Sequence, residues 1–434
     1  MNSSQHLNPD LGSESYFYAS HISNGCVPRF VVTLKMGIDE AVLRQTMDDI
    51  QPRFPQMSVR IVKSADGKNY HLEENHEPFP VFHDKGNTIR TMCSPETNDH
   101  LLAVTWYEKY LMFDLHHLLG DGTGFIIFIN AVLFRYFQLL GLPLENDGSI
   151  LTVDQPFDES EAEDPYRAVM DTPVPDLPDW YKKGREVFNV PCPTTDDDPA
   201  ETVVQIRIPF DKFRTVFKRY ESSPVTFLGP LFSHAIYEKY QDEIGDKCIV
   251  TSVPVNLRPY YPTPTLRYFI TVAVLAHSEL FLKEAFEDRL KTQKELLDIQ
   301  THKEFLTALA QRHISGMEKF RDLDMTVEQK YELMDKKVRT SMNDVTYVMT
   351  NMGKISVPES MQEYIQEYFP MLPTATCAFT IATTTWKNEL MLSITQRNRE
   401  TDVCERFVDM LRKMDVPAYI SDVFMYHTMR CYPK

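Results

Sequence analysis

Glycine is scarce in this chain of 434 residues, which contains only 15 glycines, about half of the usual share of roughly 7%. Few loops can therefore bring their backbone close to a phosphate group. Neither Gly67-Lys68 nor Gly353-Lys354 is followed by Ser or Thr. These absences exclude the P-loop of nucleotide-binding proteins.

Paired cysteines and clustered basic residues are also lacking. The seven cysteines are scattered and odd in number, and no CxxC spacing occurs, so neither a disulfide framework nor a zinc knuckle is indicated. The net charge is −17 and there is no basic run, which argues against nucleic acid as a partner because phosphate binding needs clustered Lys and Arg. Dispersed, reduced thiols are typical of the cytosol, and we expect a cytoplasmic protein.

No uninterrupted apolar run reaches about 20 residues, the length that spans a membrane. The most apolar stretch, residues 125–141, is interrupted by Asn130, Arg135 and Gln138, and we interpret it as a buried helix. The first residues are polar and lack the basic and then apolar pattern of a signal peptide. We therefore expect a soluble protein without a membrane anchor.

Strand and helix patterns alternate in both halves of the chain. Strands are predicted at 29–36, 57–62, 101–106, 110–115, 203–208, 248–255, 345–352, 377–386 and 390–396. Helices are predicted at 39–50, 122–140, 224–240, 278–299, 303–313, 327–337 and 403–413. The interleaving lacks strict βαβ regularity, which favours an α+β fold. A weakly structured region rich in Pro, Asp and Thr, residues 146–201, separates the halves, and we predict an N-terminal lobe of residues 1–185 and a C-terminal lobe of residues 186–434.

The segment most informative about chemistry is LMFDLHHLLGDGTGF, residues 111–125. A predicted strand ends in His116-His117, and Asp121 and Gly122 follow just before the buried helix. Strand alternation directs the two imidazoles to opposite faces, so that one can face the core and the other a cleft. A carboxylate is favourable near a helix start, and Gly122 permits a sharp turn that a Cβ atom would block.

Two later segments supply candidate partners for this motif. VPVNLRP, residues 253–259, places Arg258 at the end of a buried strand, where a guanidinium needs an anion. A bidentate pair with Asp121 would lock the loop after His117; pairing with another nearby carboxylate is the alternative. VMTNMG, residues 348–353, is another strand that ends in a polar residue and Gly, which either turns there or lines a cleft.

Taken together, these segments resemble a known superfamily. HHLLGDG is similar to the HHxxxDG signature of the chloramphenicol acetyltransferase-like superfamily, VPVNLRP to its Asn-x-Arg-Pro segment, and VMTNMGKISVP to its Thr/Ser-Asn-x-Gly strand followed by Pro. The resemblance implies two lobes, each a mixed sheet with helices, and an active-site tunnel between them. The DFGWG motif of plant acyltransferases is absent, so the resemblance points to a free-standing, condensation-domain-like enzyme of the alcohol acetyltransferase or polyketide-associated branch.

The resemblance also implies roles for the matched residues of the first motif. His117 would be the general base that removes a proton from an acceptor hydroxyl or amine as that group attacks an acyl thioester. Gly122 would keep the turn open and let its amide approach the thioester carbonyl oxygen, where charge develops. His116 would be a structural neighbour.

For the remaining positions the implied roles are supporting ones. Asp121 would point away from the substrate and pair with Arg258 to hold the loop. Asn256 and Asn351 would line the tunnel.

The implied reaction is transfer of an acyl group from a thioester to a hydroxyl or amine, with no bound cofactor or metal. Acyl-CoA, or a phosphopantetheine thioester, would be a co-substrate, so the expected partners are a small-molecule donor and acceptor. A separate carrier protein is a further candidate donor, although carrier proteins are usually acidic and a chain of net charge −17 repels them. We expect a monomer.

Three alternatives stay open at this point. The first is a non-catalytic binding protein that retains the two-lobe fold. The second is an amide-forming condensation with a carrier protein as donor. The third is a metal hydrolase that uses His116, His117 and Asp121, which is geometrically poor because adjacent histidines on a strand point apart.

Overall fold

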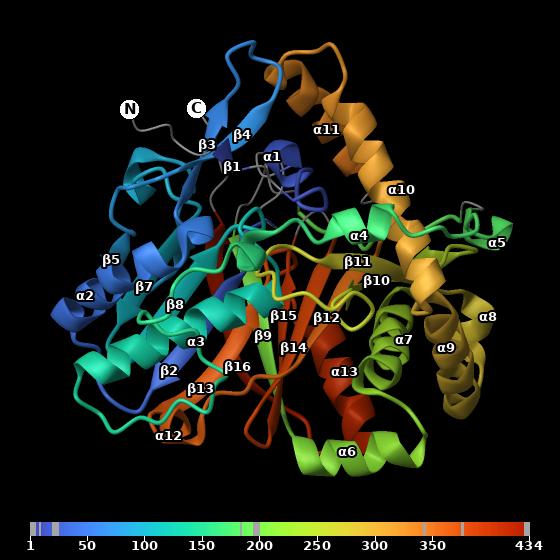
Figure 1. Cartoon of the computed structure of the whole chain (residues 1–434). Coiled ribbons are helices and arrows are strands. Elements are labelled where there is room, and N and C mark those ends of the chain that lie inside the picture. Colours follow the sequence, from blue (N-terminus) through green and yellow to red (C-terminus); the bar gives the residue numbers. More distant parts are fainter. Residues whose placement is uncertain are drawn as a thin grey trace.

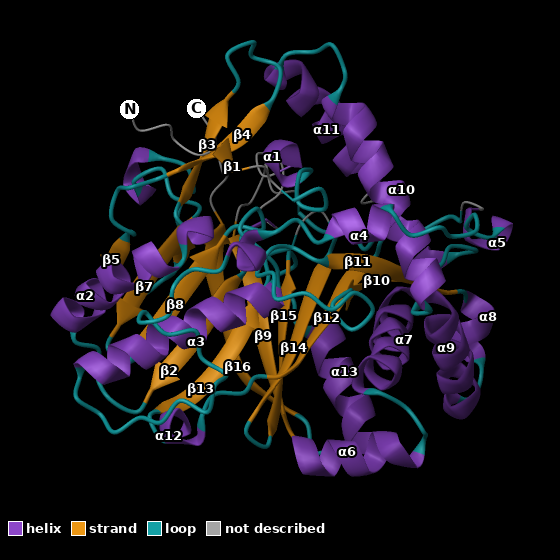
Figure 2. Ribbon diagram, viewed as in Figure 1, coloured by secondary structure: helices purple, strands orange, loops and turns teal. Residues whose placement is uncertain are grey.

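Two mixed β-sheets with helices packed on their outer faces form the body of the protein, as the computed structural model shows (Figures 1 and 2). The structure describes residues 6–7, 10–19, 26–182, 185–193, 200–341, 344–374 and 377–428. The described helices are α1 Tyr16–Ala19, α2 Glu40–Ile50, α3 Gly122–Leu139, α4 Tyr166–Met170, α5 Asp179–Lys182, α6 Phe210–Arg219, α7 Pro224–Ile244, α8 Glu279–Lys283, α9 Phe286–Gln300, α10 Lys303–Arg321, α11 Val327–Ser341, α12 Glu359–Gln362 and α13 Asp402–Lys413. The described strands are β1 His6–Leu7, β2 Arg29–Leu34, β3 Val59–Lys63, β4 Tyr70–Glu74, β5 Val81–His83, β6 Thr88–Ile89, β7 Leu102–Tyr107, β8 Tyr110–Leu115, β9 Ala200–Pro209, β10 Ile249–Asn256, β11 Ile270–His277, β12 Tyr347–Lys354, β13 Ile365–Met371, β14 Phe379–Trp386, β15 Glu389–Gln396 and β16 Tyr419–Thr428.

The two large sheets divide the strands between two lobes. One sheet has five strands in the order β13-β2-β8-β7-β5 and is covered by α2 and α3. The other has eight strands in the order β11-β10-β12-β14-β15-β9-β16-β6, and α6, α7 and α13 cover one of its faces. A small third sheet has the order β1-β4-β3. Both large sheets contain parallel and antiparallel pairs, so the predicted α+β class with two mixed-sheet lobes is confirmed.

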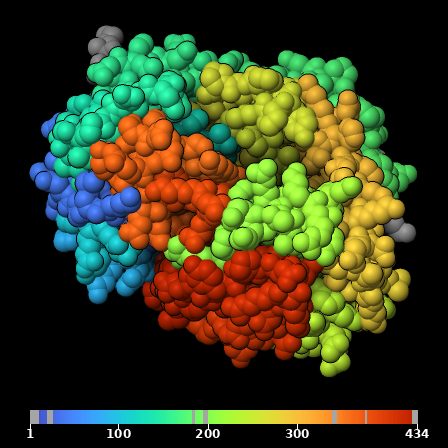
Figure 3. All heavy atoms as spheres, turned by 90° about the horizontal axis from the view of Figure 1, so that it is seen from below, coloured from blue at the N-terminus to red at the C-terminus, as the bar shows by residue number. Residues whose placement is uncertain are grey.

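Strands are exchanged between the lobes in both directions. β13, from the C-terminal half, pairs antiparallel with β2, and Phe369 lies opposite Val31. β6, from the N-terminal half, pairs with the end of β16. Figure 3 shows the orange surface from the later part of the chain directly beside the blue and teal surface of the N-terminal half. The lobes are therefore joined by shared sheets, and the division of the chain near residue 185 stays a prediction.

Helix α3 is the core helix of the five-stranded sheet. It is apolar nearly all round and, among the described helices, it is the one long and apolar enough to cross a membrane. Its buried residues, among them Phe125, Phe128 and Phe137, pack instead into the same hydrophobic core as β2, β7 and β8. This is the behaviour expected of the buried helix that the sequence predicts.

Most predicted elements are present, and the structure differs from the prediction at a few places. The single helix expected at 278–299 is two helices, α8 and α9, separated at Glu284-Ala285. The region expected to be weakly structured contains the short helices α4 and α5. Among the described elements that lie outside the predicted ones, the longest are α6, β11, β13 and β16.

Candidate active site

A cavity of about 370 Å³ lies between the two lobes, and the end of β8 and the start of α3 form one of its walls. Its lining comprises Tyr16, His117, Asp121, Gly122, Thr123, Ile126, Ser252, Pro254, Asn256, Tyr268, Ile270, Val272, Val345, Val348, Thr350, Asn351, Met352, Leu372, Pro373 and Thr380. This volume is within the range of small-molecule sites. Each of the three segments singled out in the sequence contributes to the cavity, and VMTNMG lines it with β12 residues.

His117 lines the cavity, and a hydrogen bond defines which of its ring nitrogens carries the proton. Its Nδ1 atom lies 3.1 Å from the carbonyl oxygen of Gly120. A carbonyl can only accept, so Nδ1 carries the proton and Nε2 has a free lone pair. Burial lowers the pKa of His117, although the Gly120 carbonyl and Asp121 oppose that shift. The imidazole is therefore neutral near pH 7, as a general base must be.

Aromatic rings surround His117, and two of them are residues that the sequence analysis did not select. Tyr16 stacks on the imidazole with ring centroids 5.2 Å apart, and Tyr268 contacts it edge-on at 5.7 Å. The hydroxyl of Tyr16 donates to that of Tyr268 at 3.4 Å, and burial raises the pKa of both phenols. Tyr268 follows the selected segment VPVNLRP in the chain, whereas no sequence pattern around Tyr16 distinguishes that residue.

His116 is fully buried and, unlike His117, is not one of the residues that line the cavity. Its Nδ1 accepts a hydrogen bond from the backbone amide of Leu118 at 3.1 Å, so its proton is on Nε2. Burial and the neighbouring His117 lower the pKa of His116 to about 3. This imidazole is a neutral part of the core.

Asp121 is the N-cap of α3, and both of its carboxylate oxygens have two donors. Oδ1 accepts from the backbone amides of Thr123 and Gly124 at 3.0 and 3.2 Å. Oδ2 accepts from Arg258 Nη1 at 2.7 Å and from the backbone amide of Phe269 at 2.8 Å. The carboxylate therefore fastens α3 to the loop after β10, and the predicted ion pair with Arg258 is present.

The geometry of that pair differs from the expected bidentate one. Only Nη1 of Arg258 reaches Asp121. Nη2 donates to the carbonyls of Thr265 and Arg267 at 3.0 and 2.7 Å, and Nε reaches Thr265 at 3.3 Å. The prediction of a bidentate pair is wrong because the other edge of the guanidinium satisfies the carbonyls of a loop that would otherwise have buried acceptors without donors.

The structure requires glycine in the motif at Gly120 and Gly124, and not at Gly122 as predicted. Gly122 does not have a positive φ, and a Cβ atom there would meet only the flexible end of the Met352 side chain, at 2.8 Å. A Cβ atom on Gly120 or Gly124 would lie 2.4 or 1.9 Å from the carbonyl oxygen of Leu266. The close approach of backbone to backbone therefore requires Gly120 and Gly124, and the expectation that Gly122 forms the tight turn is wrong.

The Gly122 amide itself is available, because it has no hydrogen-bond partner among the described residues. It is the first residue of α3, and the helix start favours negative charge. A donor of this kind beside His117 suits an oxygen on which charge develops.

Asn256 and Asn351 both line the cavity but are used differently. The Nδ2 of Asn256 donates to Thr123, and its Oδ1 accepts from the backbone and Nη1 of Arg258, so this side chain links the start of α3 to Arg258. Asn351 Oδ1 accepts from the Gly353 amide and from Thr383, so this residue shapes the irregular end of β12.

The loop that carries Leu266 is held in turn by a buried ion pair outside the sequence motifs. Arg53 donates from two nitrogens to the two oxygens of Glu161, both at 2.7 Å, and both side chains are almost completely buried. The carbonyl of Glu161 accepts from the backbone amide of Leu266. An Arg and a Glu that lie 108 residues apart carry no local signal of this contact.

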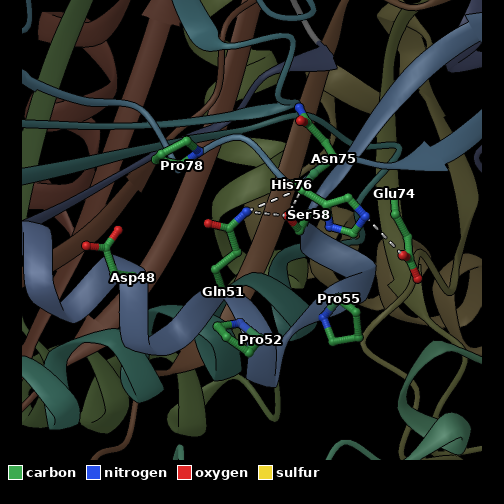
Figure 4. A pocket seen from close by; sticks show the side chains of 9 residues that line it. All are labelled: Asp48, Gln51, Pro52, Pro55, Ser58, Glu74, Asn75, His76 and Pro78. Carbon is green, nitrogen blue, oxygen red and sulfur yellow. Dashed lines mark hydrogen bonds and ion pairs between the residues drawn. The ribbon is translucent and has the colours of Figure 1, made fainter. Parts of the chain in front are cut away.

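Two further features concern a possible metal site and a second hollow in the surface. Among the described residues, no three His, Cys, Asp or Glu side chains lie close enough together to hold a metal ion. A second hollow, of about 410 Å³, lies beside the end of α2 (Figure 4). The Gln51 amide there donates to Ser58 at 2.8 Å and to the carbonyls of Asn75 and Glu77. The Gln51 amide group is thus satisfied within the N-terminal lobe.

Comparison by sequence finds no match, either with protein-family profiles or with curated proteins. Comparison by structure finds a shared fold. The first condensation domain of the CDA synthetase superposes with a TM-score of 0.61 and 13% identity, over 95% of this chain and 97% of that chain.

Two structures from Fusarium sporotrichioides have the same fold. Trichothecene 15-O-acetyltransferase TRI3 gives a TM-score of 0.61 at 11% identity, over 94% of this chain and 93% of that chain. TRI101, solved with coenzyme A and T-2, gives 0.60 at 11% identity, over 96% and 100%. The chain therefore has the fold that this condensation domain shares with TRI3 and TRI101.

Proposed function

We propose that this protein is an acyltransferase that moves an acyl group from a thioester, acyl-CoA in the first place, to a hydroxyl or amine acceptor. The observation that carries the proposal is His117, whose Nδ1–H is fixed on the Gly120 carbonyl and whose Nε2 lone pair is left free in a ring that lines the cavity. The fold supports it, because TRI3 is an acetyltransferase and TRI101 was solved with coenzyme A.

In the proposed reaction, Nε2 of His117 takes the proton of the acceptor as its oxygen or nitrogen attacks the thioester carbonyl carbon. The carbonyl oxygen becomes negatively charged, and the Gly122 amide donates to it. When the tetrahedral intermediate collapses, the C–S bond breaks and the leaving thiolate receives the proton from Nε2. The step balances without an acyl-enzyme, and His117 returns to its starting tautomer.

Asp121 takes no part in the proton transfer, since its two oxygens already accept four hydrogen bonds. It is a positioning residue that fixes α3, and with it Gly122, against the loop that Arg258 organises. The mechanism thus has one base and no carboxylate partner for it.

The direct test is thiol release from a panel of acyl-CoA donors with alcohol and amine acceptors, with products identified by mass spectrometry. His117→Ala should lower kcat by about 10²- to 10⁴-fold, the usual contribution of a general base. His116→Asn is the matched control, because its amide oxygen can replace Nδ1 as the acceptor for Leu118, and it should retain activity within about tenfold of the wild type. An unchanged rate in His117→Ala would contradict the proposal.

A further inference from the structure

The chemistry of the cavity lining restricts what can bind beside His117. Among the described lining residues, the side chains with an acidic or basic group, phenols aside, are His117 and Asp121. His117 is neutral, and each oxygen of Asp121 already has two donors, one of which is the Arg258 guanidinium. The charge of Asp121 is therefore neutralised within the protein and is not available to a ligand.

Aliphatic side chains form much of the remaining wall. Ile126 comes from α3, Ile270 and Val272 from β11, and Val348 and Met352 from β12. They converge from both lobes on the space in front of the imidazole. Such a surface stabilises apolar groups by about 25 cal/mol for each Å² removed from water.

Apart from His117 and Asp121, the polar side chains that line this space are uncharged hydroxyls and the amides of Asn256 and Asn351. Ser252, Val348 and Thr380 lie in one row across β10, β12 and β14, since Ser252 pairs with Val348 and Val348 with Thr380. All three line the cavity. The Tyr16 and Tyr268 phenols also line the cavity, and they remain protonated because burial raises their pKa. Hydroxyls of this kind bind hydroxyl and carbonyl groups and have no net charge to offer an ion.

We infer that the acceptor is an uncharged and mainly apolar alcohol, which rests on the proposed function and narrows its acceptor class. The cavity volume of about 370 Å³ is within the usual range for sites that bind small organic molecules. The body of such an alcohol fits this space, and its reacting hydroxyl lies at His117. Amino acids and polyamines, which carry charge at neutral pH, fall outside this class.

The expected difference in affinity between neutral and charged acceptors follows from the fraction of the charged acceptor that is neutral at the working pH. An alkylammonium group with a pKa near 10.4 is uncharged in about one molecule in 10³ at pH 7.4. If the cavity admits only the neutral form, an ammonium group on the acceptor weakens binding up to about 10³-fold. A carboxylate with a pKa near 4.3 is penalised by a similar factor.

The test uses three probes with one skeleton: hexan-1-ol, 6-aminohexan-1-ol and 6-hydroxyhexanoate. All three keep the reacting hydroxyl, so only the charge at the far end differs. Binding to the wild-type protein is measured by calorimetry without a donor, and turnover separately with acetyl-CoA. Hexan-1-ol should bind at least 10²-fold more tightly than either charged probe and should be the best acceptor.

Binding and turnover separate the two proposals. Equal or tighter binding of a charged probe, or no measurable binding of hexan-1-ol, overturns the inference whatever the turnover. Selective binding of hexan-1-ol without thiol release by any donor supports the inference and counts against the proposed acyl transfer.

A charge placed in the wall provides a second and independent check. Val348→Asp should raise the affinity for 6-aminohexan-1-ol relative to hexan-1-ol at least tenfold, whereas Val348→Asn, of the same size and uncharged, should not. Ser252→Asp with Ser252→Asn repeats the comparison from β10 if the Val348 variants fail to fold. If a folded Asp variant shows the same relative affinity for 6-aminohexan-1-ol and hexan-1-ol as the wild type, the alcohol does not lie against the row of Ser252, Val348 and Thr380.

Discussion

Replacing Asp121 by Asn tests whether this carboxylate is a clamp between the lobes. In Asp121→Asn one carboxylate oxygen becomes an NH₂ group, which cannot accept a hydrogen bond. In one orientation of the side chain this group faces Arg258 and the backbone amide of Phe269, and in the other it faces the backbone amides of Thr123 and Gly124. The side chains of Asp121 and Arg258 are only 3% and 12% exposed. Removing one partner of a buried ion pair costs about 3–5 kcal/mol, so the free energy of unfolding should fall by that amount.

A double-mutant cycle isolates the contact itself. Arg258→Met removes the guanidinium but also leaves the carbonyls of Thr265 and Arg267 without their donor. We expect this single change to cost about 3 kcal/mol, and the double variant to cost about 1–3 kcal/mol less than the sum of the two, the coupling usual for residues in contact.

Unfolding in urea, followed by the fluorescence of Trp106 and Trp386, which are buried in one hydrophobic core, measures these free energies. Glu40→Gln is the matched control, because it makes the same carboxyl-to-amide change in the exposed pair of Glu40 and Arg44 and should cost at most about 1 kcal/mol. Costs that add within about 0.5 kcal/mol would refute the clamp.

The structure also makes predictions about the motif glycines and about acid stability. Gly124→Ala should lose activity and several kcal/mol of stability because its Cβ atom would overlap the Leu266 carbonyl. Gly122→Ala should cost less than about 1.5 kcal/mol of stability, since the Met352 side chain can move. Melting followed by circular dichroism and the thiol-release assay compare the two variants, and equal losses would contradict the packing described. Burial lowers the pKa of His277 to about 4. Between about pH 6.5 and pH 4, His277 is protonated in the unfolded chain but not in the native protein. The free energy of unfolding should therefore fall by about 1.4 kcal/mol for each unit by which the pH is lowered through this interval. In His277→Gln, urea midpoints should depend less steeply on pH over this interval; an unchanged dependence would show that this imidazole titrates normally.

Local sequence patterns predict helix α3 and its cap closely, because the signals lie together. Asp121 precedes an apolar run, and its side chain caps the first turn. The hairpin of β7 and β8 is equally local, with its turn at Glu108-Lys109 and a positive φ at Glu108. In these segments each residue meets neighbours that are close in sequence, so periodicity is sufficient.

Strand β13 shows why other elements are missed. Its sequence contains Pro370, which argues against a strand because proline cannot donate to the sheet. β13 is nevertheless tolerated because it is the edge strand of the five-stranded sheet, beside β2. Its partner lies more than 300 residues earlier in the chain, and no local pattern encodes such a pairing.

The same distinction applies to the site. The sequence identifies His117, Asp121 and Arg258 by motif; the structure brings His117 and Asp121 to one cavity and pairs Arg258 with Asp121. It does not identify Tyr16, because the stacking on His117 depends on a helix from the first residues of the chain. Nor does it reveal the Leu266 carbonyl, which only the close approach of two loops makes significant.

The contacts of the Leu266 loop argue that the base and its cavity are assembled from both lobes as one unit. The backbone of Leu266 packs on Gly120, whose carbonyl fixes the His117 tautomer. The carbonyl groups that flank Leu266 orient Arg258, which holds the carboxylate that starts α3. A displacement of this loop would therefore disturb the free Nε2 lone pair and the Gly122 amide together. Variants that weaken the loop should lower kcat before they alter the affinity for an apolar ligand, since the aliphatic wall on β12 belongs to the sheet and not to the loop.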